Sequence, residues 1–115
     1  MNATCIFCRI VEGTAPASVV YSDDDVLAFR DIHPQAKTHI LVIPKRHFVS
    51  LNDATEADSG FLGRLVQVAA AVAQQEGIDE SGYRVVTNTG PDACQSVDHL
   101  HFHLLGGEPM SPRLA

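Results

Sequence analysis

The order of apolar and polar residues along this 115-residue chain predicts an α+β fold with one long helix, one short helix and five strands. From residue 55 to 76 apolar side chains recur at helical spacing, with Thr55 as a suitable N-cap and Gly77 as a stop signal. A short helix is expected over 5–12. Strands are expected over 18–21, 26–29, 39–43, 83–87 and 97–105. Hairpins combined with one long helix favour a five-stranded antiparallel sheet that the helix covers on one face.

Two of these predicted strands have informative surroundings. The segment 39–43 is almost continuously apolar and is followed by Pro44, which cannot donate to a sheet ladder, so we expect it at the centre of the sheet. The run Ser22-Asp23-Asp24-Asp25 is typical of a turn and joins the first two strands as a hairpin. The segment 88–96 contains Gly-Pro-Asp and is expected to be a loop before the last strand.

The last predicted strand carries the strongest chemical signal. Histidines alternate with apolar residues, so a period of two places His99, His101 and His103 on one face of the strand and the apolar side chains on the core face. A single histidine is more often a satisfied core or surface residue, but three in register indicate a site. Because the outer two would lie roughly 13 Å apart, all three cannot bind one zinc ion. The remaining interpretation is nucleophilic and acid–base chemistry, with the preceding loop, including Gly90 and Ser96, offering donors to a phosphate.

Composition restricts the class of ligand. The chain has ordinary globular usage with no repeat or low-complexity tract, which predicts one domain over 1–115 with a core of about 4–107. The net charge is −6 and no basic run is longer than Lys45-Arg46, so a nucleic acid polymer is not an expected partner. A small phosphorylated molecule remains compatible, because local donors outweigh a distant acidic field.

The chain shows no signal for export or membrane insertion. Its first residues lack a basic segment followed by a long apolar one, and the longest apolar stretch is interrupted by Gln67. Three cysteines, two of them only three residues apart, do not suggest a disulfide framework. We therefore expect a cytoplasmic protein with reduced cysteines and no membrane association.

The motif QSVDHLHFHLLGG, together with DIHPQAKTHILVIPKRHF upstream, resembles the histidine triad (HIT) family and specifically its HINT branch. The resemblance covers nearly the whole chain. It implies a HIT-like fold and a purine nucleoside phosphoramidase activity that transfers AMP or GMP to a histidine and then to water. The catalytic residues implied are His101 as nucleophile, His103 and Ser96 at the phosphate and leaving group, and His99 as a support for the nucleophile.

The same resemblance implies a nucleotide-binding site. Asp31 would hold the ribose hydroxyls, Asn88 would face the phosphate side, and His39 matches a fourth histidine near the site. The base and ribose would lie among apolar side chains: Ile6, Phe7, Ile10, Phe29, Ile32 and Leu41. Each of these apolar residues has an alternative role as ordinary core.

A second site is suggested by Cys5-Ile-Phe-Cys8, because two thiolates and two imidazoles complete a tetrahedral zinc site. Some bacterial HIT proteins have such a structural site, and the resemblance implies His47 and His99 as the remaining ligands. A lone CxxC has two other interpretations, namely a redox pair and two small buried residues.

Several functional alternatives remain at this stage. With the same site, the chain could instead be a dinucleoside polyphosphate hydrolase. It could also be a weakly active nucleotide-binding or scaffold protein that zinc stabilises. The resemblance also implies a homodimer, and the broad apolar surface of residues 61–73 favours that helix as part of the interface. The chain departs from the family at His33, at Cys94 where glycine is usual, at Asp98, and in a C-terminal tail without tryptophan.

Overall fold

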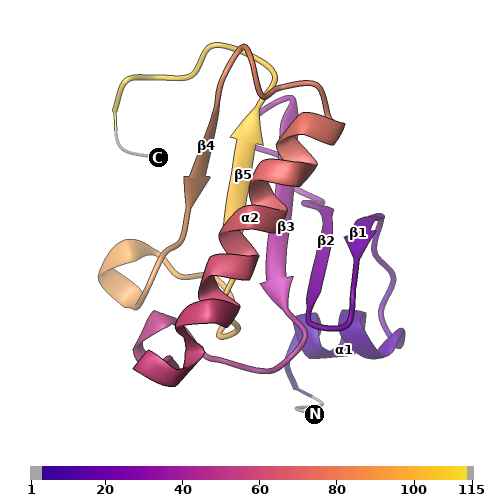
Figure 1. The fold of residues 1–115 in the computed structure, drawn as a ribbon, viewed down its shortest axis with the longest axis vertical. Coiled ribbons are helices and arrows are strands. Elements are labelled where there is room, and N and C mark those ends of the chain that lie inside the picture. Colours follow the sequence, from indigo (N-terminus) through magenta and orange to yellow (C-terminus); the bar gives the residue numbers. More distant parts are fainter. Residues whose placement is uncertain (1–3, 114–115) are drawn as a thin grey trace.

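Five antiparallel strands form the centre of the fold, in the order β1-β2-β3-β5-β4 (Figure 1). The structure is a computed structural model and describes residues 4–113. The strands are β1 (Val19–Ser22), β2 (Val26–Arg30), β3 (Thr38–Pro44), β4 (Tyr83–Val86) and β5 (Phe102–Gly106). The helices are α1 (Ile6–Glu12) and α2 (Ser59–Gln75), with three 3₁₀ turns, η1 (Leu51–Asp53), η2 (Glu56–Asp58) and η3 (Pro91–Ala93). The expected α+β sheet with one long and one short helix is confirmed.

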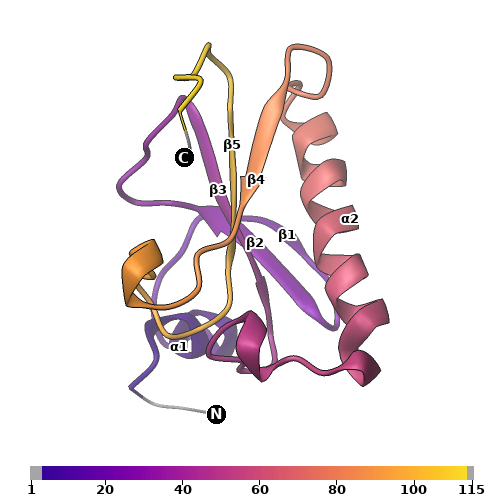
Figure 2. The ribbon, with the colours of Figure 1, turned by 90° about the vertical axis from the view of Figure 1, so that its left-hand side faces the viewer.

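The central position of β3 is explained by its apolar residues on both faces. Ile40 and Val42 belong to a core cluster with α2, whereas Leu41 and Ile43 belong to a second cluster with α1. Successive strand residues point to opposite faces, so the two helices cover opposite sides of the sheet (Figure 2). Because both faces of this strand are buried, apolar side chains are favoured at every position, and polar and apolar residues do not alternate along it.

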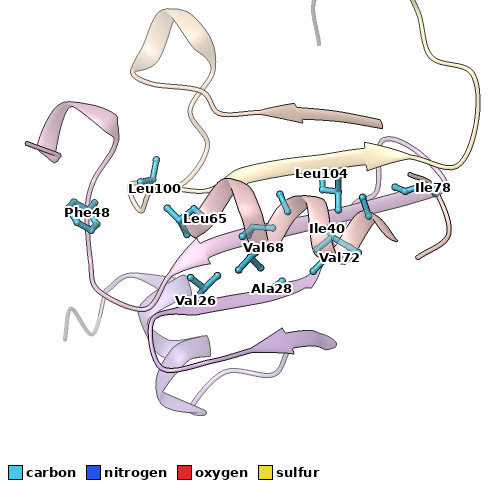
Figure 3. Close-up of a cluster of buried hydrophobic side chains, with 13 residues drawn as sticks. Val26, Ala28, Ile40, Phe48, Leu65, Val68, Val72, Ile78, Leu100 and Leu104 are labelled. Atoms are coloured by element: carbon cyan, nitrogen blue, oxygen red, sulfur yellow. The ribbon is translucent and has the colours of Figure 1, made fainter. Parts of the chain in front are cut away.

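The long helix α2 begins later than its sequence pattern predicts. Thr55 caps the 3₁₀ turn η2 in a reciprocal capping box with Asp58, and the α-helix follows from Ser59. One stripe of α2 is fully buried against the sheet (Figure 3), and it comprises Leu65, Val68, Ala69, Val72 and Ala73. The helix ends before Gly77, whose φ of +74° is a left-handed conformation that glycine adopts without strain.

The last strand is shorter than predicted, and this changes the position of two histidines. The expected strand over 97–105 is wrong at its start, because β5 begins at Phe102, which pairs with Val42 at the end of the ladder. The amide of Leu100 donates instead to the carbonyl oxygen of Phe48, at 2.7 Å, outside the sheet. His99 and His101 therefore precede the strand, and the three histidines do not form one row on a strand face.

Among residues 4–113, no helix combines the length and apolar character needed to cross a bilayer. The longest, α2, has 17 residues and lies along the sheet (Figure 2).

The turn between β1 and β2 is held by the carboxylate of Asp23. One of its oxygens accepts hydrogen bonds from the amides of Asp25 and Val26, each at 2.8 Å. The other accepts from the Tyr21 hydroxyl and from the Arg64 guanidinium of α2, again at 2.8 Å. Partial burial alone would raise the pKa of Asp23. The hydrogen bonds from these four donors outweigh that effect and hold the pKa well below its ordinary value of 3.8.

We expect Asp23→Asn to reduce the free energy of unfolding by about 1 kcal/mol, because the amide cannot accept four donors as the carboxylate does. Since folding lowers the pKa of Asp23, its stabilisation is complete above the unfolded-state pKa and is lost as the pH falls below it. Urea unfolding at pH 7 and pH 3 measures both effects. The exposed neighbour substituted as Asp24→Asn is the control. Equal stability of Asp23→Asn and this control at pH 7 would contradict the assignment.

Candidate functional site

Four side chains from three parts of the chain converge beside the start of α1. Cys5 caps the helix, Cys8 lies in its first turn, His47 follows β3 and His99 precedes β5. Their ligand atoms all lie within 4.8 Å of one another. The His99 Nδ1 atom is 3.3 Å from Cys5 Sγ, 3.5 Å from Cys8 Sγ and 3.1 Å from His47 Nδ1. The structure thus brings together all four residues of the expected metal site.

The geometry of this cluster fits a tetrahedral zinc ion. With Zn–S bonds of about 2.3 Å and Zn–N bonds of about 2.0–2.1 Å, ligand atoms of a tetrahedral site are separated by roughly 3.3–3.8 Å, close to the separations of 3.1–3.5 Å found here. The Nε2–H of His99 donates to the Pro44 carbonyl oxygen at 2.8 Å, which leaves the lone pair of the neutral ring on Nδ1, facing the cluster. Burial lowers the pKa of His99 to about 4 and favours this neutral form. The donors present therefore suit zinc.

His101 is buried and oriented by the backbone. Its Nδ1 lies 2.7 Å from the carbonyl oxygen of His99, which only accepts, so Nδ1 carries a proton and Nε2 of the neutral ring has the lone pair. The rings of Phe7 and His101 form a T-shaped pair whose centroids are 5.2 Å apart. The side chain is only 2% exposed, and this burial lowers the pKa of His101. The face of the chain that carries His101 is therefore not open to solvent at this residue, where Phe7 of α1 packs against the ring.

His39 and His103 form a directed hydrogen-bond pair. The backbone amide of Gln35 donates to Nδ1 of His39 at 3.0 Å, so the proton of the neutral His39 ring is on Nε2. This Nε2 lies 2.9 Å from Nδ1 of His103, which must accept. The remaining nitrogen of His103, Nε2, then carries a proton. Burial, together with the neighbouring His101 and His39, lowers the pKa of His103 to about 4.

Asp31, His39 and His103 also approach one another closely enough to suggest a second metal site. The Asp31 carboxylate is 3.4 Å from Nε2 of His39. A metal would need the lone pair of that nitrogen, but the amide of Gln35 occupies Nδ1 and leaves the proton on Nε2. This cluster is therefore a hydrogen-bonded arrangement and not a metal centre.

A cavity of about 460 Å³ adjoins His101 and His103. Its wall includes every apolar residue expected at the base and ribose, and it also includes Asp31 and Ser96: Ile6, Phe7, Ile10, Phe29, Asp31, Ile32, Leu41 and Ser96. Asp31 is held by the His33 amide, which donates to its Oδ1 at 2.8 Å, so its side chain is fixed at the rim. Residues from α1, β2, β3 and the loop before β5 thus meet in one pocket.

Two of the expected nucleotide-binding residues lie elsewhere. His39 and Asn88 line a second cavity of about 600 Å³, which also includes His103. His103 therefore stands between the two cavities. The loop 88–96 also differs from expectation, because the Gly90 amide donates to the side chain of Gln95 at 2.9 Å and is not available to a phosphate.

Sequence reasoning missed some participants in the site. The 460 Å³ cavity also includes Ala15, Pro16, Ala17, Arg30, His33 and Val97. Proximity in sequence to Asp31 could have indicated Arg30 and His33. The role of the Gln35 amide had no signal in the sequence, because the position of a backbone donor depends on the path of the chain and not on the type of residue.

Comparison with known proteins places this geometry in a family context. A family model described as HIT domain matches residues 12–110. The chain is 50% identical over 115 residues to a purine nucleoside phosphoramidase of Escherichia coli K12, covering 100% of this chain and 97% of that protein. It is 55% identical over 112 residues to a 14 kDa zinc-binding protein of Zea mays, covering 96% and 87%. A HIT family hydrolase structure from Legionella pneumophila superposes with a TM-score of 0.92 at 48% identity, covering 94% and 96%.

Proposed function

Because the chain belongs to the HIT family, we propose that it is a nucleotidyl hydrolase that cleaves purine nucleoside 5′-phosphoramidates through a nucleotide covalently bound to His101. The observation that carries this proposal is the lone pair on His101 Nε2, fixed by the hydrogen bond from Nδ1 to the His99 carbonyl oxygen. The E. coli relative named as a phosphoramidase supports the substrate class. A buried, neutral imidazole with one nitrogen held by the backbone is suited to attack phosphorus.

The proposed reaction has two displacements at phosphorus. His101 Nε2 forms a bond to phosphorus while the P–N bond breaks, and its electron pair goes to the leaving amine. His103, which takes up a proton when the anionic phosphoramidate binds beside it, transfers its Nε2 proton to that amine and is left as a neutral ring. In the second displacement, water attacks phosphorus, the bond to His101 breaks, and His103 accepts the proton of the water. The products are a nucleoside monophosphate, AMP or GMP, and a free amine.

The nucleoside would occupy the 460 Å³ cavity, with its base among the apolar residues of α1, β2 and β3. The Asp31 carboxylate would accept hydrogen bonds from the ribose hydroxyls at the rim. Ser96 lines the same cavity as both histidines and would donate its hydroxyl to the phosphate. Asn88 lies on the side of His103 away from the base and would face the phosphate from there.

We propose a structural role for zinc at Cys5, Cys8, His47 and His99. The ligand separations fit the ion, and the maize relative named as a zinc-binding protein supports it. Zinc there would fasten α1 to the end of β3 and to the start of the histidine motif. It would contribute by holding the backbone carbonyl of His99 against His101, with no part in the displacement at phosphorus.

We expect His101→Asn to lose at least about 1000-fold in kcat, because the amide cannot form the nucleotide intermediate. Hydrolysis of an AMP–lysine phosphoramidate gives the rate, and mass spectrometry of wild-type enzyme quenched during turnover detects one nucleoside monophosphate on His101. The variant should still bind AMP in a calorimetric titration, which controls for folding. Activity of the variant within tenfold of wild type would contradict the nucleophile assignment.

The same assay separates the remaining candidate functions. A dinucleoside polyphosphate hydrolase would cleave such a polyphosphate faster than the phosphoramidate. A nucleotide-binding or scaffold protein would bind AMP but release no amine and form no adduct on His101.

We expect one zinc ion per chain in protein purified without chelator, and Cys8→Ser should lose it. Metal binding contributes to folding free energy, so the variant and the chelated wild type should both melt at a lower temperature. Elemental analysis and thermal unfolding make the measurement. The matched control is Cys94→Ser, which removes the exposed cysteine and should keep both zinc and melting temperature. Zinc-free wild-type protein with an unchanged melting temperature would exclude the structural role.

We also propose a homodimer, in which the surface of α2 and the edge strand β4 form the interface. Five apolar residues of α2 are used by the core, but Val66 remains 49% exposed, and Val85 of β4 is 36% exposed. Strand β4 ends the sheet, so one side of its backbone has no strand partner among residues 4–113. Two copies of the chain related by a two-fold axis would bury the exposed valines and the open edge of β4 against each other.

Light scattering at micromolar concentration should therefore give about twice the 12.4 kDa mass of one chain. We expect Val66→Glu to shift the mass toward the monomer, because a carboxylate would be buried without a partner. The adjacent exposed residue substituted as Gln67→Glu adds the same charge and should leave the dimer intact. A wild-type mass of a single chain would refute the dimer.

A further inference from the structure

The second cavity adjoins the proposed reaction centre on the side away from the base. It has a volume of about 600 Å³ and lies between β4, β5 and the C-terminal segment 107–113. In the register of these strands, Arg84 pairs with Leu105 and Val86 pairs with His103, and all four line the cavity. Leu104 belongs to the core cluster under α2, so the cavity lies on the opposite face of the sheet from that helix.

His103 is the residue that the two cavities share. If the nucleoside occupies the first cavity and phosphorus lies between His101 and His103, the leaving group extends past His103 into the second cavity. This step rests on the proposed function, because it requires a substrate in which a nucleotide is joined to another group. It follows that the residues of the second cavity other than Asn88 and the two histidines would contact only the leaving group.

The charges around this cavity are opposite to those of the whole chain. Arg84 and Arg113 both line it, whereas the single acidic residue there, Glu108, accepts a hydrogen bond from the amide of Lys37 at 2.9 Å. Arg84 donates from its guanidinium to the Ser111 carbonyl oxygen, which holds the C-terminal segment over the cavity and keeps its charge there. The two guanidinium groups and the one hydrogen-bonded carboxylate give this cavity a net positive charge, although the net charge of the whole chain is −6.

The apolar part of the wall comes from both strands and the C-terminal segment: Val86, Leu105, Pro109 and Met110. An apolar wall with a positive group at its rim suits a small molecule that has a hydrocarbon body and a negative end. A leaving group with a second ammonium would instead meet two like charges.

We propose that this cavity is a leaving-group site for amines that carry a carboxylate, such as an amino acid joined to phosphorus through its α-amine. Arg84 and Arg113 bind the carboxylate, and the apolar wall contacts the amino acid side chain. The enzyme thereby selects phosphoramidates of amino acids over those of neutral or doubly cationic amines.

The test compares AMP joined to the amine of alanine with AMP joined to the amine of alaninamide, two leaving groups that differ in the carboxylate alone. In Arg84→Gln and in Arg113→Gln, the ratio of kcat/KM for the alanine substrate to that for the alaninamide substrate should fall by about fivefold. The kcat/KM for the alaninamide substrate should change less than that for the alanine substrate. The matched control is Arg9→Gln, an exposed position on α1 outside both cavities, which should keep the wild-type ratio.

The outcomes separate the two proposals. If both substrates are hydrolysed and neither arginine variant changes the ratio, the carboxylate site is refuted while the proposed function stands. If wild type hydrolyses neither substrate, the proposed function fails. If Arg84→Gln also slows the alaninamide reaction, it has displaced the C-terminal segment, and the ratio in Arg113→Gln then decides.

Discussion

An imidazole ring has two nitrogens, and in this protein the backbone binds one of them at each of three buried histidines. The Gln35 amide donates to His39, the His99 carbonyl accepts from His101, and the Pro44 carbonyl accepts from His99. Each of these bonds determines whether the other nitrogen of a neutral ring has a proton or a lone pair. The lone pair of His99 thereby faces the cysteine pair, that of His101 is on Nε2, and His39 can only donate to His103. Burial lowers the pKa of all four rings and keeps them neutral, so that this assignment holds at physiological pH.

Much of this arrangement could be predicted from the sequence, for identifiable reasons. The apolar run of β3 indicated a central strand, because only a strand covered on both faces lacks polar alternation. The Cys-x-x-Cys pair and the family resemblance indicated the four residues that cluster at the start of α1. Cys94 has a φ of +60°, a left-handed conformation that glycine adopts without strain. This conformation explains why the family resemblance implied glycine at this position.

Other features depended on tertiary contacts that no local pattern contains. The alternation of histidine and apolar residues predicted a strand through His99, but the hydrogen bond of Leu100 to Phe48 ends the ladder at Phe102. The burial of His101 depends on α1, which lies more than eighty residues away in sequence. The direction of the hydrogen bond between His39 and His103 depends on one main-chain amide. Residue types could therefore identify the participants but not their protonation or exposure.

Helix α1 contributes to two sites at once, although it has only seven residues. Cys8 in its first turn and the capping Cys5 belong to the cluster that fits zinc. Its residues Ile6, Phe7 and Ile10 line the 460 Å³ cavity. Under the proposed function, the two ligands are thermodynamically linked, because any displacement of α1 weakens both sites together. Such linkage is reciprocal: the factor by which zinc raises the affinity for nucleotide equals the factor by which nucleotide raises the affinity for zinc. Saturation with nucleotide would thus reduce the fraction of zinc lost to a competing chelator at equilibrium, and a cell rich in substrate would retain a larger metallated fraction of the enzyme when free zinc is scarce.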